Sequence, residues 1–192
     1  EVSVSSVRDY AMRALTATTS SAKVKTLVVD MLNYGAAAQT HFGYNTEDLA
    51  NAKLTDAQKA WATGDVACTD RRVKGKNYYG SNLALEDKIL LNLFFTNCTE
   101  GMTAKVSYID YTGKTVTADA ELVRYSGKIY KVTVDEIVLA DAFCDVTVTV
   151  YDGSTVHASA TDSVESYVAR AEGSDLYATI IKFASSAKAY FS

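Results

Sequence analysis

The chain has 192 residues, of which 48% are hydrophobic and 22% are charged, and its formal net charge is -4 at pH 7. This length and composition are typical of a compact globular fold of one domain, or of one domain with an appended subdomain, and they exclude a disordered chain or a coiled coil. The acidic balance argues against nucleic acid as a partner, because phosphate backbones are bound through clustered Lys and Arg.

Membrane and metal signals are missing from the sequence. No apolar run approaches the roughly 18 residues that a membrane-spanning helix needs, and residues 1–20 carry no signal-peptide pattern. We therefore expect no membrane insertion and an excised, soluble piece of a longer protein. Cys68, Cys98 and Cys144 form no CxxC pair and have no nearby His at metal-ligand spacing. The sequence thus predicts neither a disulfide framework nor a zinc site.

The N-terminal region predicts a helical hairpin followed by a short helix. Ser6 is a candidate N-cap for a stripe of apolar residues that ends near residue 16. A second stripe covers residues 24–42, and Gly43 is suited to end it. The segment LTDAQKAW, residues 54–61, matches a capping box and predicts a short third helix.

From about residue 82 the apolar pattern changes from helical to strand-like. The strand segments are 82–96, 106–122, 128–139 and 143–160, and the turn signals YTGK and YDGS each divide one of them into a hairpin. Five to seven short strands in about 80 residues are typical of an antiparallel sandwich or half-barrel. Helical periodicity then returns at residues 162–171 and 176–191.

The two helical regions resemble each other. Ser6-Val7-x-x-Tyr10 corresponds to Ser163-Val164-x-x-Tyr167. Five later positions also correspond in order, namely Leu27, Leu32, Tyr34, Ala38 and Phe42 with Leu176, Ile181, Phe183, Ala187 and Phe191. A duplicated unit, made of a β module followed by a helical hairpin, explains this order economically.

We therefore predict an α+β fold, with an antiparallel β-sandwich-like sheet flanked by two similar helical hairpins. Residues 1–66 form the first hairpin plus the short capped helix, as the tail of a preceding repeat. Residues 67–160 form the antiparallel β domain, and residues 161–192 form a second hairpin that packs on the rest. The small residues GAAA, 35–38, leave a bare helix surface on which the sheet or the second hairpin can pack closely.

Three segments carry a resemblance to a known kind of module, namely SVRDYAMRAL, LVVDMLNYGAAAQTHFGYNTEDLAN and NLALEDKILLNLFF. They resemble a module of large, multimodular extracellular proteins of gut Clostridia, ruminococci among them, most specifically at LNYGAAAQ-x-x-FGYNT-x-x-LAN. The resemblance implies an extracellular or cell-surface location, neighbouring modules of the same parent protein as partners, and no catalytic activity. The second hairpin departs from the pattern, because it has FASSAKAYF and no GYNT tail.

An enzyme is not indicated. The two histidines, His41 and His157, lie in no motif with a known catalytic mechanism. Asp141, Asp145 and Asp152 are near one another in sequence, but they form no DxDxDG-like calcium loop. We therefore predict no catalytic residues, no cofactor and no metal site.

A ligand site is predicted from aromatic and amide side chains. Trp61 is the only Trp, and Tyr78 and Tyr79 lie beside Asn77 and Asn82 in a turn-rich segment. Sugars stack on aromatic rings and are read at the rim by amides, so these five residues have suitable chemistry. The alternative is structural: Trp61 is buried against the sheet, and one of the two adjacent tyrosines faces the core.

The predicted function is a non-catalytic extracellular accessory module of a multimodular bacterial surface or secreted protein, which binds a polysaccharide or a host or plant glycan or serves adhesion. The first alternative is a structural spacer or protein-docking module, for which the flat polar face of Thr147, Thr149 and Tyr151 is suited. An enzyme of unknown type is the third.

Overall fold

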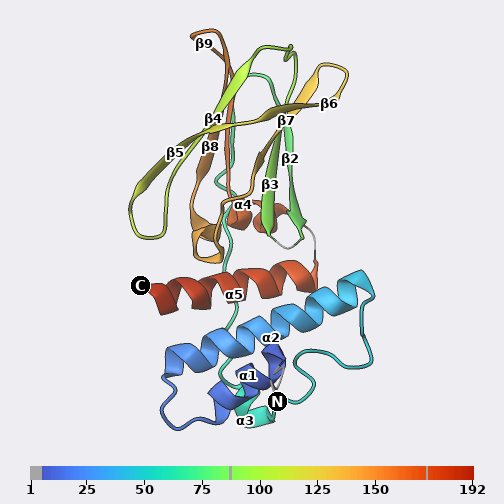
Figure 1. Ribbon diagram of the computed structural model, residues 1–192, viewed down its shortest axis with the longest axis vertical. Helices are drawn as coiled ribbons and strands as arrows, with labels where there is room; N and C mark the ends of the chain where they lie inside the picture. Colours follow the sequence, from blue (N-terminus) through green and yellow to red (C-terminus); the bar gives the residue numbers. More distant parts are fainter. Residues whose placement is uncertain (1–5, 87, 172) are drawn as a thin grey trace, which may run out of the picture. The chain divides into compact units, whose positions relative to one another are not determined.

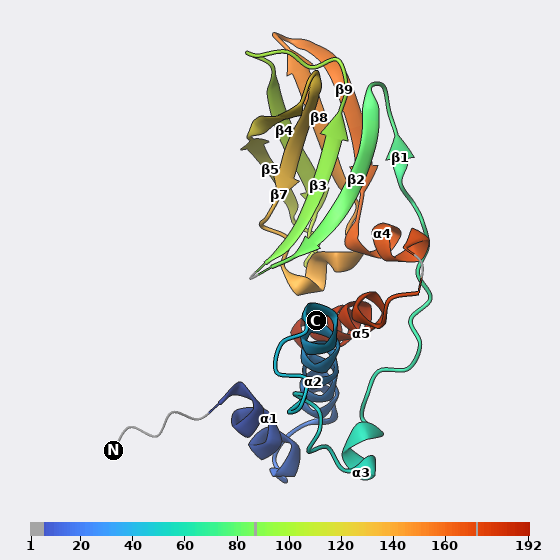
Figure 2. The same cartoon turned by 90° about the vertical axis from the view of Figure 1, so that its right-hand side faces the viewer.

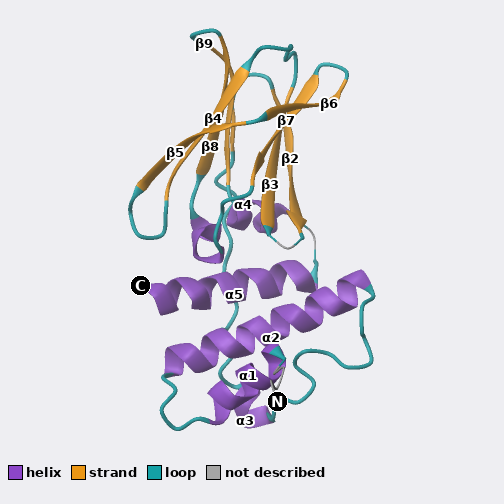
Figure 3. Ribbon diagram, in the orientation of Figure 1, coloured by secondary structure: helices purple, strands orange, loops and turns teal. Residues whose placement is uncertain are grey.

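A computed structural model describes residues 6–86, 88–171 and 173–192 of the protein. These residues form an α+β fold that divides into two compact units (Figure 1). The helical unit consists of the described parts of residues 1–67 and 172–192, and the β unit consists of those of residues 68–171. Figure 3 shows that all the strands lie in the β unit. No helix of the described segments is both long enough and apolar enough to cross a membrane.

The helical unit contains α1 (Val7–Thr16), α2 (Ala22–Phe42), α3 (Asp56–Lys59) and α5 (Asp175–Phe191). The predicted caps are confirmed. Ser6 forms a capping box with Asp9, and a second capping box starts α3. Gly43 ends α2 in the left-handed region with φ 65°, where glycine carries no steric penalty.

Two apolar contacts hold the helical unit together. On one side of α2, a buried cluster joins α1, α2 and the loop before α3, and its members are Ala11, Leu15, Val29, Leu32 and Leu54. On another side α2 packs against α5, where Tyr34 and Phe183 stack with their ring centroids 6.0 Å apart. The GAAA segment, residues 35–38, was predicted to pack against the sheet or the second hairpin. At Gly35 the neighbour is instead the loop that follows α2, since a Cβ added to Gly35 would lie 3.1 Å from the Cβ of Ala50.

The β unit is a sandwich of two antiparallel sheets, which Figure 2 shows as two layers. One sheet has the strand order β1-β9-β8-β4-β5 and the other β2-β3-β7-β6. The bounds are β1 (Val73–Lys74), β2 (Tyr78–Leu85), β3 (Ile89–Phe95), β4 (Thr103–Ile109), β5 (Thr115–Ala120), β6 (Leu122–Ser126), β7 (Ile129–Val134), β8 (Val146–Asp152) and β9 (Thr155–Asp162). A 3-10 helix, η1 (Leu139–Phe143), precedes β8, and α4 (Val164–Arg170) follows β9.

Buried side chains of both sheets form the core of the sandwich. Leu91, Leu93 and Phe95 of β3 are fully buried, and so are Val148 and Val150 of β8. The described strands number nine rather than five to seven. The additional strands give little periodic signal, because β1 has only two residues and β6 is mostly exposed.

The predicted hairpin at residues 161–192 is divided between the two units. Its first helix, α4, belongs to the β unit, whereas α5 belongs to the helical unit. Charged and hydroxyl side chains hold α4: Arg170 pairs with Asp162 of β9, and Arg71 pairs with Glu165 at 2.7 Å. Helix α5 instead buries apolar residues, Ile181 among them. The polar partners of α4 and the apolar face of α5 explain the division.

Candidate functional site

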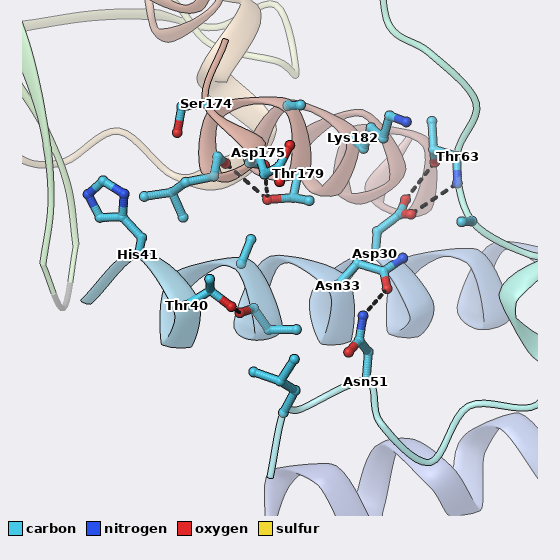
Figure 4. A pocket seen from close by; sticks show the side chains of 16 residues that line it. Asp30, Asn33, Thr40, His41, Asn51, Thr63, Ser174, Asp175, Thr179 and Lys182 are labelled. Atoms are coloured by element: carbon cyan, nitrogen blue, oxygen red, sulfur yellow. Dashed lines mark hydrogen bonds between the residues drawn. The ribbon is translucent and has the colours of Figure 1, made fainter. Parts of the chain in front are cut away.

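A pocket of about 590 Å³ lies within the helical unit, between α2, α5 and two connecting segments. Figure 4 shows its polar side chains converging from both helices. The lining residues are Asp30, Asn33, Ala36, Ala37, Thr40, His41, Leu49, Asn51, Ala62, Thr63, Ser174, Asp175, Leu176, Ala178, Thr179 and Lys182. Its volume falls in the range of about 300–1,000 Å³ that is usual for small-molecule sites.

Asp30 fixes one wall of the pocket. Its side chain is on α2 and the residue is only 1% exposed. The carboxylate accepts hydrogen bonds from the backbone N–H of Thr63, at 3.0 Å, and from the Thr63 hydroxyl, at 2.5 Å. A buried carboxylate needs such donors, since an unpaired charge away from water is costly. Asp30 therefore ties the segment after α3 to the middle of α2.

Amide side chains order the loop that follows α2. Asn51 donates to Asn33 at 2.9 Å, and the backbone N–H of Ala50 donates to Gln39 Oε1 at 2.7 Å. The other end of the Gln39 amide donates to the carbonyl oxygen of Asn45 at 3.0 Å. These bonds preorganise the loop, so that little entropy remains to be lost when a ligand binds.

Hydroxyl and charged groups line the pocket from both α2 and α5. Thr179 Oγ1 donates to the carbonyl oxygen of Asp175 at 2.8 Å, and Thr40 Oγ1 donates to that of Ala36 at 3.0 Å. Each hydroxyl hydrogen is thus engaged in its own helix, which leaves the oxygen lone pairs as acceptors. Lys182 Nζ lies 2.9 Å from Asp65 Oδ1 and adds a positive charge to the lining.

Two acidic groups outside the lining depend on bases of the helical unit. The pKa of Asp48 lies below its ordinary value of 3.8, chiefly because Arg8 donates hydrogen bonds to that carboxylate. The pKa of Asp65 is lowered likewise, chiefly by the hydrogen bond from Lys182. A lowered folded-state pKa gives a stabilising contribution that is complete above the ordinary pKa and is lost as the pH falls through the folded value.

Acid should therefore weaken the helical unit. We expect its free energy of unfolding to decrease as the pH falls from about 5 toward and below the ordinary pKa, because Asp48 and Asp65 then become protonated. The double variant Asp48→Asn, Asp65→Asn should show a shallower dependence. The single Trp, Trp61, lies in this unit, so urea titrations followed by Trp fluorescence at each pH measure it. If the free energy of unfolding depended on pH equally in the wild-type protein and the double variant, the stabilising role of Asp48 and Asp65 would be contradicted.

The predicted ligand residue Trp61 lies outside the described pocket. It is 39% exposed, and Lys25 Nζ is 5.2 Å from its ring centroid. One face of the indole is therefore occupied by a cation. Trp61 belongs to the helical unit, whereas the other four predicted residues belong to the β unit. The predicted set of five is not brought together within one unit.

Two of the four predicted residues in the β unit have local structural roles. Tyr78 donates from its hydroxyl to Ser81 Oγ at 3.0 Å, and its ring meets the edge of Phe95. Asn77 adopts φ 58° and donates to the carbonyl oxygen of His157 at 2.9 Å.

The other two are exposed. Tyr79 is 64% exposed, and Asn82 is exposed on β2, where its Oδ1 accepts a hydrogen bond from Asn92 at 2.8 Å. The register shifts between Tyr78 and Gly80, which leaves Tyr79 in a β-bulge.

The histidines are differently placed. His41 lines the pocket and is exposed, and its ring meets the edge of the Phe42 ring. His157 belongs to β9, and its carbonyl oxygen accepts a hydrogen bond from the side-chain amide of Asn77. Among the described residues, no three His, Cys, Asp or Glu side chains are grouped so that they could hold a metal ion. No disulfide joins any two of the three cysteines, all of which lie in the described residues.

The residues of the pocket are not among the predicted site residues, although much of the lining lies in the segment LNYGAAAQTHFGYNTEDLAN, residues 32–51. Seven lining residues come from residues 32–51, namely Asn33, Ala36, Ala37, Thr40, His41, Leu49 and Asn51. Asp30 offered a further signal, since it interrupts the apolar run around it. A carboxylate at such a position is buried only when donors are provided for it.

Comparison of the chain with protein-family models, with curated protein sequences and with solved structures finds no match. The resemblance of residues 32–51 to a module of extracellular proteins therefore stays a prediction.

Proposed function

We propose that the protein is a non-catalytic binding module whose helical unit takes a small, hydroxyl-rich ligand of sugar size in the pocket between α2 and α5. The observation that carries this proposal is the composition of the lining, which combines amides, hydroxyls, carboxylates and one ammonium around a space of about 590 Å³. Each of these groups can donate to or accept from a sugar hydroxyl, and the pocket is large enough for one or two sugar rings.

The apolar part of the lining also suits a sugar. Ala36, Ala37, Ala62, Leu176 and Ala178 give small, flat apolar surfaces next to the polar groups. A sugar ring has an apolar CH face and a hydroxyl rim, so it can use both kinds of surface at once. None of the described residues that line the pocket is Trp, Tyr or Phe, so we expect moderate affinity that depends on hydrogen bonds.

The proposed setting is extracellular, as an accessory module of a multimodular bacterial surface or secreted protein that serves glycan attachment or adhesion. Residues 32–51, which resemble such a module, supply seven of the sixteen lining residues. A non-catalytic role is supported by the way in which two charged groups are engaged. Asp30 accepts two hydrogen bonds from Thr63, and Lys182 pairs with Asp65.

A matched pair of substitutions on α5 tests the pocket. Ala178 lines it and is exposed, whereas Ala189 is exposed on the same helix outside the lining. Ala178→Trp should fill the space and weaken glycan binding about tenfold or more, which corresponds to about 1.4 kcal/mol. Ala189→Trp should leave binding within about twofold. The measurement is a glycan array with plant polysaccharides, starch and mucin glycans, followed by calorimetry on the best ligand.

The same array separates the alternatives. Loss of binding in Tyr79→Ala or Trp61→Ala, with Ala178→Trp unaffected, would keep glycan binding but move it to the exposed aromatic residues. No binding to any glycan class by the folded protein would reject the proposal in favour of the structural spacer or protein-docking module. Circular dichroism of each variant shows whether it has folded.

A further inference from the structure

A second cavity, of about 310 Å³, lies in the β unit. Its lining comes from β4, β5, the β5–β6 junction, β6 and the end of β7, and the residues are Val106, Tyr108, Val116, Ala118, Asp119, Ala120, Glu121, Val123, Thr133, Val134, Asp135 and Glu136. In Figure 1, β5 and β6 run as one ribbon that crosses from one sheet to the other. We call this cavity the β5–β7 groove.

The core side of β5 is uncovered at the groove. Val116 and Ala118 are paired with Tyr108 and Val106, so they share the inward face of the sheet. Val106 is buried, yet Ala118 is exposed. Inward-facing residues of a sandwich are normally covered by the opposite sheet. The β5–β7 groove is therefore an apolar face of the sandwich that no described part of the chain covers.

Two unpaired strand edges border the groove. β5 is the last strand of its sheet and pairs only with β4. β7 pairs with β6 through Ile129–Val132 only, so Thr133 and Val134 have a strand neighbour on the β3 side alone. Unpaired strand edges present rows of N–H and C=O groups, to which an extended peptide can add as a further strand.

The rim of the groove is acidic. It has four carboxylates, from Asp119, Glu121, Asp135 and Glu136. Within the described chain, Asp119 pairs with Lys105 at 2.9 Å and Asp135 pairs with Lys88 at 3.4 Å, whereas Glu121 and Glu136 form no ion pair. Two of the four negative charges are thus left without a partner. Such a rim favours a basic ligand and repels an acidic one.

Tyr108 brings a phenolic hydroxyl to the lining of the groove. The residue is 9% exposed. Burial, followed by the nearby charges of Asp141 and Glu136, raises the pKa of Tyr108. The hydroxyl is therefore protonated at neutral pH and can donate to a carbonyl oxygen.

We propose that the β5–β7 groove docks an extended, basic peptide segment, which adds as a strand to the free edge of β5 or β7 and directs its Lys or Arg side chains to the acidic rim. Apolar side chains of the same segment cover Val116 and Ala118, and one carbonyl oxygen accepts from Tyr108. The volume suits a few side chains of an extended segment rather than a folded partner. The proposal concerns the β unit, so it does not depend on the glycan pocket of the helical unit.

The test uses the full chain and a fluorescein-labelled peptide of alternating Lys and Val, with the matching Glu and Val peptide as its opposite. Fluorescence anisotropy should detect binding of the Lys peptide only. Ala118→Trp should weaken that binding about tenfold or more, whereas Thr117→Trp, on the same strand but on the opposite face, should change it less than about twofold. Glu121→Gln with Glu136→Gln should weaken it about tenfold, against Glu100→Gln as the control outside the groove.

A third peptide, N-methylated at alternate residues, separates strand addition from simple charge attraction. It keeps the charges but cannot donate from those amides, so we expect its binding to be lost. Hydrogen exchange should slow in residues 115–120 or 129–134 when the unmodified Lys peptide binds. Equal binding of the N-methylated peptide, or equal effects of Ala118→Trp and Thr117→Trp, would overturn the proposal, and so would failure of the Lys peptide to bind the folded chain.

Discussion

Asp162→Ala is expected to lower the free energy of unfolding of the β unit by about 3 kcal/mol, because it removes the buried partner of a largely buried guanidinium and leaves only Asp70, whose Oδ1 lies 3.5 Å from Arg170 Nη1. The Asp162 side chain is 0% exposed and that of Arg170 is 18% exposed. Arg170 donates to both carboxylate oxygens of Asp162, with Nη1 lying 3.0 Å from Oδ1. Such bidentate pairs are among the strongest polar contacts in proteins.

The same carboxylate has further donors. Ser81 Oγ lies 2.5 Å from Asp162 Oδ2, and the backbone N–H of Ser163, the N-cap of α4, donates to Oδ1 at 2.9 Å. Arg170 also donates to Ser81 at 2.8 Å, so the serine connects β2 with both members of the pair. Removal of the carboxylate thus disturbs β2, β9 and α4 together.

Hydrogen exchange measured by mass spectrometry across urea concentrations can follow the β unit, since the only Trp is in the helical unit. The control is Asp119→Ala, which breaks the exposed pair with Lys105 and should cost less than about 1 kcal/mol. Asp162→Asn keeps the shape and loses the charge, so it should fall between the two. A loss below about 1 kcal/mol in Asp162→Ala would contradict this prediction and would show that Asp70 or water compensates the charge of Arg170.

Asp30→Ala should destabilise the helical unit by about 3 kcal/mol. Hydrogen bonds to charged groups contribute about 1.5–3 kcal/mol each, and Asp30 accepts two of them from Thr63. Without the carboxylate, both donors of Thr63 lose their acceptor, and the segment after α3 is released from α2. Trp61, two residues earlier in the same segment, should report this change directly.

A double-mutant cycle separates the Asp30–Thr63 contact from general effects of truncation. Thr63→Val removes the hydroxyl donor, and its combination with Asp30→Ala should cost less than the sum of the single substitutions. Asp175→Ala is the matched control, because Asp175 lines the same pocket but is exposed. It should change stability by no more than about 0.5 kcal/mol. Strict additivity in the cycle would contradict a direct contact between Asp30 and Thr63.

Local features of this protein were determined by the sequence itself. Ser6 and Ser163 each cap a helix, and Gly43 ends α2, because caps depend on side chains within three or four residues. The alternation in β8 places Val146, Val148 and Val150 on the buried face, because the side-chain period of a strand is two. The α+β class follows from these local patterns.

The two cavities were decided by tertiary structure. The helical pocket joins residues of α2 with residues of α5, more than a hundred positions apart, and the β5–β7 groove depends on where β6 stops pairing with β7. The five predicted ligand residues are divided between the two units, because Trp61 belongs to the helical unit and the other four belong to the β unit.

Tertiary contacts also decided that residues 161–192 are divided between the two units. The apolar pattern of residues 163–191 repeats that of residues 6–42, and the sequence therefore predicted a second helical hairpin. Arg170 of α4, however, finds Asp162 and Ser81 in the β unit, whereas Phe183 of α5 finds Tyr34 of α2. Local sequence determined that both segments are helices, because capping and periodicity act within a few residues. Their different partners were decided by contacts between distant residues, which no local pattern records.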